Sequence, residues 1–239
     1  MARDSHRQTT ISQHHSEMKR LSLLILLITT YIATAQGQGI DLTISAKGGN
    51  NTLYGYYGAV AAAVDYESDM HFAIRGGAQY STIGRVAAEC RPRYYHDFDF
   101  GRVSGEILLG YTYQSSLNNY MAGVGASLDI GCIWLTLGYY LRTMTMGADY
   151  IYEPFNIYYE LGIRCLHKVE KWDLNITFTN SQLFEIERHY QPSFALDAWW
   201  YPVERLGLQL GLNYKPAGMF NISSDYYQLY GDVGVCVRW

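Results

Sequence analysis

The sequence predicts an all-β protein: a transmembrane antiparallel up-and-down β-barrel of about 12 strands, with a range of roughly 10 to 14. Three observations lead to this prediction. From Ile40 onward nearly every segment alternates apolar and polar residues, as a strand with two different faces does. The apolar face is almost free of charge, which suits lipid. Glycine and tyrosine number 23 each against 5 prolines, a composition that suits packed strands and membrane interfaces.

An export signal is expected before the barrel. A basic start at 18–20 is followed by an apolar run at 21–31 and by the small-x-small sequence Ala33-Thr34-Ala35. The run is too short for a spanning helix, which needs about 20 apolar residues. We therefore interpret 1–17 as an upstream extension or mis-start, 18–35 as a signal peptide and 36–239 as the barrel. Cleavage after Ala35 leaves 239 minus 35, or 204, residues, enough for one domain.

The alternation divides the chain into the expected strands. In order they are 40–47, 54–64, 71–80, 83 to about 92, 102–113, 120–128, 133–141, 155–164, 172–178, 193–200, 206–214 and 226–239. Pro92 cannot donate to a ladder, so the fourth strand is expected to end or bulge there. Trp134 falls on the polar side of the seventh strand, which suggests a bulge at that position.

The connections and the aromatic residues support the strand count. If the C-terminus is periplasmic, the connections on that side are all short, and the outer side has the longest ones, at 147–154, 180–192 and 215–225. Aromatic residues of the apolar face fall near strand ends, as two interface girdles would require. Those expected at periplasmic ends are Tyr66, Phe72, Trp172, Trp200 and Trp239, and those at outer ends are Tyr54, Tyr80, Tyr113, Tyr120, Phe155, Phe178, Phe194 and Tyr214.

The polar faces of the strands predict a charged lumen. Arginines come from the third to fifth strands and carboxylates mostly from the eighth to twelfth, so two walls of unlike charge would face each other across any aqueous path. The lumen selectivity candidates are Arg75, Arg85, Arg91, Arg102, Glu106, Glu160, Asp173, Asp197 and Asp232. The alternative is that these charges pair and close the interior. About 12 strands lie between filled barrels of about 8 and open channels of 16 to 18, so both readings stand.

The C-terminal strand carries a short motif. Asp232, Gly234, Val237 and Trp239 follow the order polar, glycine, apolar and terminal aromatic. This pattern resembles the assembly signal in the last strand of Gram-negative outer-membrane β-barrels. The resemblance implies a cell outer-membrane location and recognition by the outer-membrane assembly machinery. The Ala35-Gln36 cleavage context and the high tyrosine content resemble Bacteroidota envelope proteins.

Other chemistries have little support in the sequence. The net charge of -4 argues against nucleic-acid binding. Cys90, Cys132, Cys165 and Cys236 are interpreted as small buried residues, with Cys132 and Cys236 toward the lumen and the other two toward lipid. No zinc-like spacing occurs, and no metal or cofactor is expected. Outer-membrane phospholipases place a histidine and a serine at the lipid boundary; no such pair occurs here, so we expect no enzyme.

Two functions remain open. The first is a narrow porin-like channel for small polar solutes, in which the lumenal charges set selectivity. The second is a non-conducting barrel that anchors an envelope complex or binds a partner through its outer loops. In both cases we expect a monomer surrounded by outer-membrane lipid and lipopolysaccharide.

Overall fold

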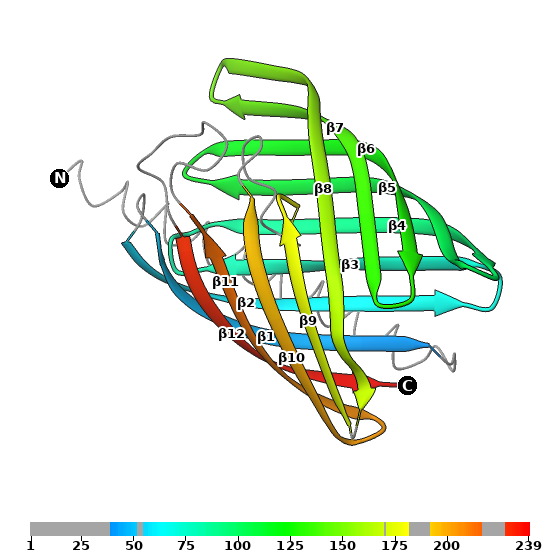
Figure 1. The fold of residues 1–239 in the computed structure, drawn as a ribbon. Coiled ribbons are helices and arrows are strands. Elements are labelled where there is room, and N and C mark those ends of the chain that lie inside the picture. The colour runs from blue at the N-terminus through cyan, green and yellow to red at the C-terminus, as the bar shows by residue number, and fades with distance from the viewer. Residues whose placement is uncertain (1–38, 52–54, 170, 182–191, 217–227) are drawn as a thin grey trace. The chain divides into compact units, whose positions relative to one another are not determined.

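Twelve strands make up nearly all of the chain that the structure describes (Figure 1). The structure is a computed structural model and describes residues 39–51, 55–169, 171–181, 192–216 and 228–239. The predictions for 1–17 and 18–35 therefore lie outside the described residues. The strands are β1 (Ile40–Asn51), β2 (Gly55–Ser68), β3 (Phe72–Ser81), β4 (Val86–Phe98), β5 (Gly101–Gln114), β6 (Leu117–Ile130), β7 (Ile133–Met146), β8 (Asp149–Val169), β9 (Trp172–Thr179), β10 (Ser193–Val203), β11 (Leu206–Lys215) and β12 (Gln228–Arg238).

The sheet closes on itself. Each strand pairs antiparallel with the next one in the chain, and β1 pairs with β12 from Asp41 opposite Arg238 to Asn51 opposite Gln228. Closure gives both edge strands a partner, so the barrel has no open sheet edge along this seam. The prediction of a closed antiparallel barrel of about 12 strands is confirmed.

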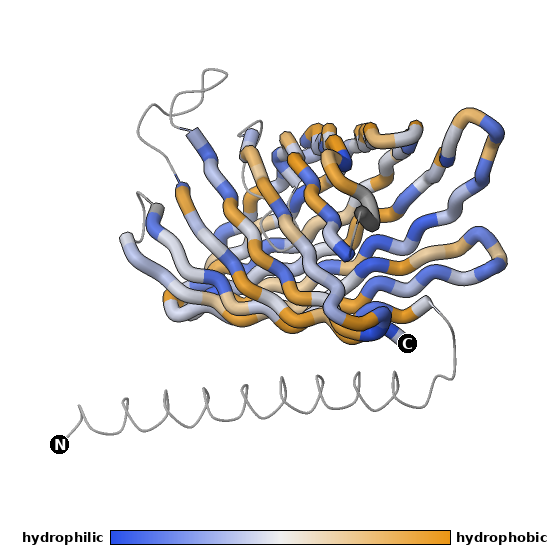
Figure 2. Tube along the Cα trace, turned by 60° about the horizontal axis from the view of Figure 1, so that its bottom comes forward, coloured by the Kyte–Doolittle hydropathy of each residue, from blue (hydrophilic) through white to orange (hydrophobic). Residues whose placement is uncertain are grey.

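Apolar side chains cover the outside of the barrel. On β7, Tyr139 is 46% exposed while the next residue, Tyr140, is 1% exposed. The same alternation is visible along most strands in Figure 2, where orange and blue segments follow one another. An apolar surface of this extent is unfavourable in water and suits hydrocarbon. None of the described residues forms a helix long and apolar enough to cross a bilayer.

Outward aromatic residues pack in pairs near both ends of the barrel. We call the end where β1 begins and β12 ends the terminal rim, and the other end the opposite rim. Near the terminal rim, the rings of Trp172 and Trp200 stack at 6.1 Å. Toward the opposite rim, Phe178 and Phe194 lie 5.0 Å apart. Tyr54, which was expected in this girdle, lies outside the described residues.

The two expected bulges are absent at the positions proposed for them. Pro92 pairs with Ile74 of β3, and β4 keeps one register with β5 on either side of it, so the strand neither ends nor shifts there. The fixed φ of proline is compatible with a strand, and only the ladder pairing toward β5 is interrupted. Trp134 is also in regular register, opposite Asp129 and Gly162. The register shift between β7 and β8 lies instead between Tyr140 and Arg142.

Two further predictions need correction. The expected loop at 147–154 is mostly strand, because β7 ends at Met146 and β8 begins at Asp149. The hairpin is therefore much longer than the alternation suggested (Figure 1). All four cysteines are free, and only Cys236 is buried. Cys132 is exposed because it lies in the turn between β6 and β7, not on a lumenal strand face, and Cys165 is exposed on the outside of β8.

Candidate lumenal site

The interior of the barrel has two unlike halves. The packed half is filled by inward side chains of β4 to β8, centred on Leu108, Met121, Tyr140 and Tyr158, which form one buried cluster. The open half is bounded by β1 to β3 and β9 to β12, with contributions from Trp134 and Glu160, and contains a cavity. Both halves have polar strand faces in the sequence, so the difference arises from side-chain size and pairing.

Tyr158 closes the packed half. Its side chain is fully buried, and its hydroxyl donates a hydrogen bond of 2.9 Å to Glu106 Oε1. The ring lies against Gly138 on the adjacent strand, where a Cβ atom would collide with it. Glycine at this position therefore allows the ring to lie flat on the barrel wall, where it occupies space that would otherwise belong to the lumen.

Matched ion pairs join the buried cluster. Arg93 donates to the other oxygen of Glu106 at 2.9 Å, and Arg91 pairs with Glu89. Arg91 also reaches across the lumen and donates to the carbonyl and hydroxyl oxygens of Ser181, at 3.0 and 2.8 Å. The Glu89 and Arg91 side chains are only 1% and 8% exposed, so their charges depend on each other for compensation.

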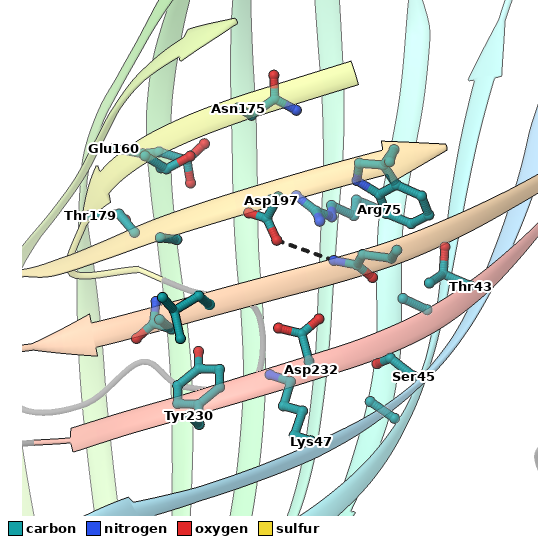
Figure 3. A pocket seen from close by; sticks show the side chains of 18 of the residues that line it. Thr43, Ser45, Lys47, Arg75, Glu160, Asn175, Thr179, Asp197, Tyr230 and Asp232 are labelled. Atoms are coloured by element: carbon teal, nitrogen blue, oxygen red, sulfur yellow. Dashed lines mark hydrogen bonds between the residues drawn. The ribbon is translucent and has the colours of Figure 1, made fainter. Parts of the chain in front are cut away.

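The cavity of the open half has a volume of about 300 Å³. Small side chains on β1 and β2, among them Ser45, Ala61 and Ala63, leave the room for it. Charged and hydrogen-bonding groups from these and the other strands point into this space (Figure 3). The lining residues are Thr43, Ser45, Lys47, Ala61, Ala63, Asp65, Arg75, Trp134, Glu160, Asn175, Thr177, Thr179, Ala195, Asp197, Trp199, Gln209, Leu212, Asn213, Tyr230 and Asp232.

The charged groups of the cavity have varied partners. Arg75 Nε lies 3.4 Å from Asp65 Oδ1, and both side chains are about half exposed. Lys47 Nζ lies over the ring of Tyr230, 5.1 Å from its centre. Lys47 is also the register partner of Asp232 across the β1–β12 seam. The cavity thus has two cationic groups, each close to a carboxylate or an aromatic ring.

Two carboxylates of the cavity accept hydrogen bonds from neutral donors. Asp197 Oδ1 accepts from the side-chain amide of Gln209 at 3.2 Å, drawn as a dashed line in Figure 3. Glu160 Oε1 accepts from the indole nitrogen of Trp134 at 2.6 Å. This bond explains why Trp134 faces inward, and its ring covers Gly162, which has no side chain to obstruct it. Neutral donors stabilise an ionised carboxylate without cancelling its charge.

The structure brings together only some of the predicted selectivity residues. Arg75, Glu160, Asp197 and Asp232 line the cavity. Arg91 and Glu106 belong to the packed half, where they are buried. The alternation could not separate these two groups, because both occupy inward positions.

Three predicted residues lie elsewhere. Arg85 directly precedes β4, in the β3–β4 connection, and is not among the residues that line the cavity. Arg102 lies at the terminal rim, where it pairs with Asp97 and Glu67 at 2.6 and 2.9 Å. Asp173 is the second residue of β9, near the same rim. The expected arginine wall is therefore divided among four places: the cavity, the packed half, the β3–β4 connection and the terminal rim.

Several lining residues were not among the predicted candidates. Lys47, Asp65 and Asn213 occupy inward positions, and the polar side of the alternation could have identified them. Trp199 and Tyr230 also fall on the polar side of the alternation, but they were not named as candidates because aromatic residues were expected mainly at the lipid interfaces. In the structure Trp199 lies opposite Gln209 and Tyr230 opposite Asn213.

The remaining sequence features have clear positions. Within the assembly motif, Asp232 lines the cavity and Trp239 is 45% exposed at the end of the chain. His71 and His96 lie 5.8 Å apart at the terminal rim, where His71 also contacts Tyr95. Among the described residues, no group of three or more histidine, cysteine or acidic side chains could hold a metal ion.

Solved structures with a similar fold were found, but no related sequence was. No family model and no curated protein matches the chain. Among solved structures, the KdgM porin matches with a TM-score of 0.53 and 10% identity over 82% of this chain and 99% of that chain. The NanC porin matches with a TM-score of 0.54 and 11% identity over 82% and 100%. The translocator domain of the autotransporter NalP from Neisseria meningitidis matches with a TM-score of 0.56 and 14% identity over 94% and 96%.

At such low identity these likenesses concern the fold alone. The chain has the closed antiparallel barrel that outer-membrane porins and an autotransporter translocator share. Proteins of different function are similar to it, so its own function must be argued from its interior.

Proposed function

We propose that this protein is an outer-membrane barrel that acts as a narrow porin-like channel for small polar solutes. The observation that carries the proposal is the polar cavity of about 300 Å³ in the open half. At ~30 Å³ per water molecule this space holds on the order of ten waters. A filled barrel would leave no such space, and a wide porin would lack the packed half.

The chemistry of the wall supports passage of polar solutes. Side chains with hydroxyl, amide, carboxylate and cationic groups alternate around the cavity, and they can replace part of the hydration shell of a solute. The similarity to two porins agrees with this proposal at the level of fold. The solute path would be restricted on one side by Tyr158 and the ion pairs around it.

The proposal includes the surroundings of the barrel. The terminal rim would face the periplasm, with the signal peptide removed and the C-terminal motif read by the assembly machinery. The apolar outer face would contact outer-membrane lipid and lipopolysaccharide, and the barrel would act as a monomer.

Single-channel recording tests the channel. Purified barrel, refolded in detergent and inserted into planar bilayers, should give discrete conductance steps. Its folded state is checked by the shift in gel mobility between unboiled and boiled samples, and boiled protein serves as the inactive control. A barrel that passes the gel test but remains silent in the bilayer would contradict the proposal.

A second candidate function has one observation in its favour. The β7–β8 hairpin continues past the pairing of β8 with β9, which begins at Glu160. Near its tip Tyr150, Ile151 and Tyr152 are 50 to 64% exposed. Such a hairpin could bind an envelope partner, so that the barrel serves as an anchor. A silent folded barrel, together with a co-purifying envelope protein whose yield falls in a Tyr150→Ser/Tyr152→Ser variant, would support this alternative.

A further inference from the structure

Several charged groups of the barrel interior form one-to-one ion pairs outside the cavity. Toward the terminal rim Arg238 pairs with Asp41 at 2.7 Å, and Arg164 with Asp129 at 2.8 Å. In the packed half Arg93 pairs with Glu106 at 2.9 Å. Each of these pairs is neutral overall, so none of them gives the lumen a preferred ion sign.

The cavity has an excess of negative charge. Its lining residues include four carboxylates, which are Asp65, Glu160, Asp197 and Asp232, and two cationic groups, which are Lys47 and Arg75. Two negative charges are therefore left over. Asp197 and Glu160 are the two of these carboxylates that accept hydrogen bonds from a neutral amide and a neutral indole. Figure 3 shows both of them directed into the same space.

The same wall contains a buried amide that is available to bind a solute. Asn213 is only 2% exposed and lines the cavity, yet neither its amide nitrogen nor its oxygen has a hydrogen-bond partner among the described residues. A buried amide without hydrogen-bond partners destabilises the folded state. A solute with a hydroxyl group could supply both a donor and an acceptor to Asn213.

We propose that the cavity is a binding and selection site for small organic cations that also carry a hydroxyl group. This inference rests on the proposed channel and names its solute class. The ammonium group would lie between Asp197 and Glu160, and the hydroxyl would meet Asn213. Repulsion by the two excess carboxylates would exclude anions of the same size.

Reversal potentials measure the sign of selection. In a KCl gradient across the bilayer the channel should prefer potassium over chloride. Asp197→Asn and Glu160→Gln should each lower the ratio of cation to anion permeability by about fivefold, which corresponds to ~1 kcal/mol for one charge pair at about 4 Å in water. Arg75→Gln should raise the ratio. Asp69→Asn, in the exposed β2–β3 turn, is the matched control and should leave it unchanged.

Binding in detergent tests the same site without conduction. Calorimetry with ethanolammonium should show binding to the folded barrel, whereas glycolate, an anion of similar size, should show none. Asn213→Leu should weaken ethanolammonium binding by about two- to tenfold, the equivalent of one hydrogen bond of ~0.5 to 1.5 kcal/mol.

The two readouts separate failure of the site from failure of the channel. A silent bilayer with ethanolammonium binding would overturn the channel and keep the cation site. A conducting barrel that prefers chloride, or whose selectivity ignores both carboxylate variants, would overturn the cation site and keep the channel. Absence of ethanolammonium binding, or equal binding of glycolate, would also overturn the cation site.

Discussion

The packed and open halves of the lumen are built from the same strand pattern and reach opposite outcomes. Around Tyr158, large inward side chains and matched ion pairs leave no space. Around Ala61 and Ala63, small inward side chains leave a cavity that polar groups face. The comparison teaches that a 12-stranded barrel can be closed on one side and open on the other, so strand number alone does not set the width of the path.

The carboxylates of the two halves also differ in the groups that bind them. In the packed half, each buried carboxylate is held by an arginine, as Glu89 is by Arg91. In the open half, Asp197 accepts from a neutral amide beside a space large enough for water. We therefore expect carboxylates to be structural in the first half and to act on solutes in the second. The following variants test this division.

The largest effect on stability is expected for Glu89→Ala. This change leaves the buried Arg91 guanidinium without its carboxylate, which should lower the free energy of unfolding by about 3 to 5 kcal/mol. Urea titration of the detergent-folded protein, followed by tryptophan fluorescence, measures it. Asp197→Ala in the open half is the comparison and should cost less than about 1 kcal/mol, because water can reach the site. Equal losses for the two variants would contradict the division of the lumen.

Leu108→Ala should have the next largest effect. Leu108 is fully buried between Met121 and the two tyrosines of the cluster, so the change leaves a void in a packed region. Large-to-small changes of this kind cost about 2 to 5 kcal/mol. The same urea titration measures the loss. A loss below about 1 kcal/mol would mean that this half of the lumen is not packed as described.

Ala63→Leu should affect conduction more than stability. The added carbons enter an existing space, so the free energy of unfolding should change by no more than ~0.5 kcal/mol, as at sites without packing strain. They should displace about three of the roughly ten waters that the cavity holds, at ~30 Å³ each, and reduce single-channel conductance by on the order of a third. Ala126→Leu, on the outer face of β6, is the size-matched control. An unchanged conductance would place the solute path outside the cavity.

The smallest effect is expected at the terminal rim. Glu67→Gln removes one of two carboxylates that pair with Arg102, while Asp97 keeps its contact. Because the Glu67 side chain is 53% exposed, water can replace the lost partner. Stability should fall by less than about 1 kcal/mol. A much larger loss in the urea titration would show that the rim pairs, and not the packed half alone, hold the barrel together.

Local pattern was sufficient to predict the strands and their faces. Alternation is a property of adjacent residues, so the outward positions of Leu135 and Leu137 could be assigned without any partner strand. The same reasoning placed Arg75, Glu160, Asp197 and Asp232 on the inner face. It failed at Pro92 and Trp134. A bulge was inferred at each of these residues from the residue alone, but the neighbouring strands accommodate both of them without a bulge.

The partition of the inner face could not be predicted from local pattern. Arg91 meets Ser181 from 90 residues away, and Tyr158 meets Glu106 from 52 residues away. The first contact crosses the lumen and the second runs along the wall from β8 to β5, so each depends on how several strands are staggered against their neighbours. From the sequence, an inward arginine that fills the interior therefore cannot be distinguished from one that lines a cavity.

The sequence by itself determined that this chain forms strands with one apolar and one polar face, because a period of two residues is imposed by backbone geometry. Only the tertiary structure decided which polar residues neutralise one another and which remain facing water. The pairing depends on the strand register around the closed barrel, because this register brings together side chains that are far apart in the chain. It also places large inward residues in one half of the lumen and small inward residues in the other.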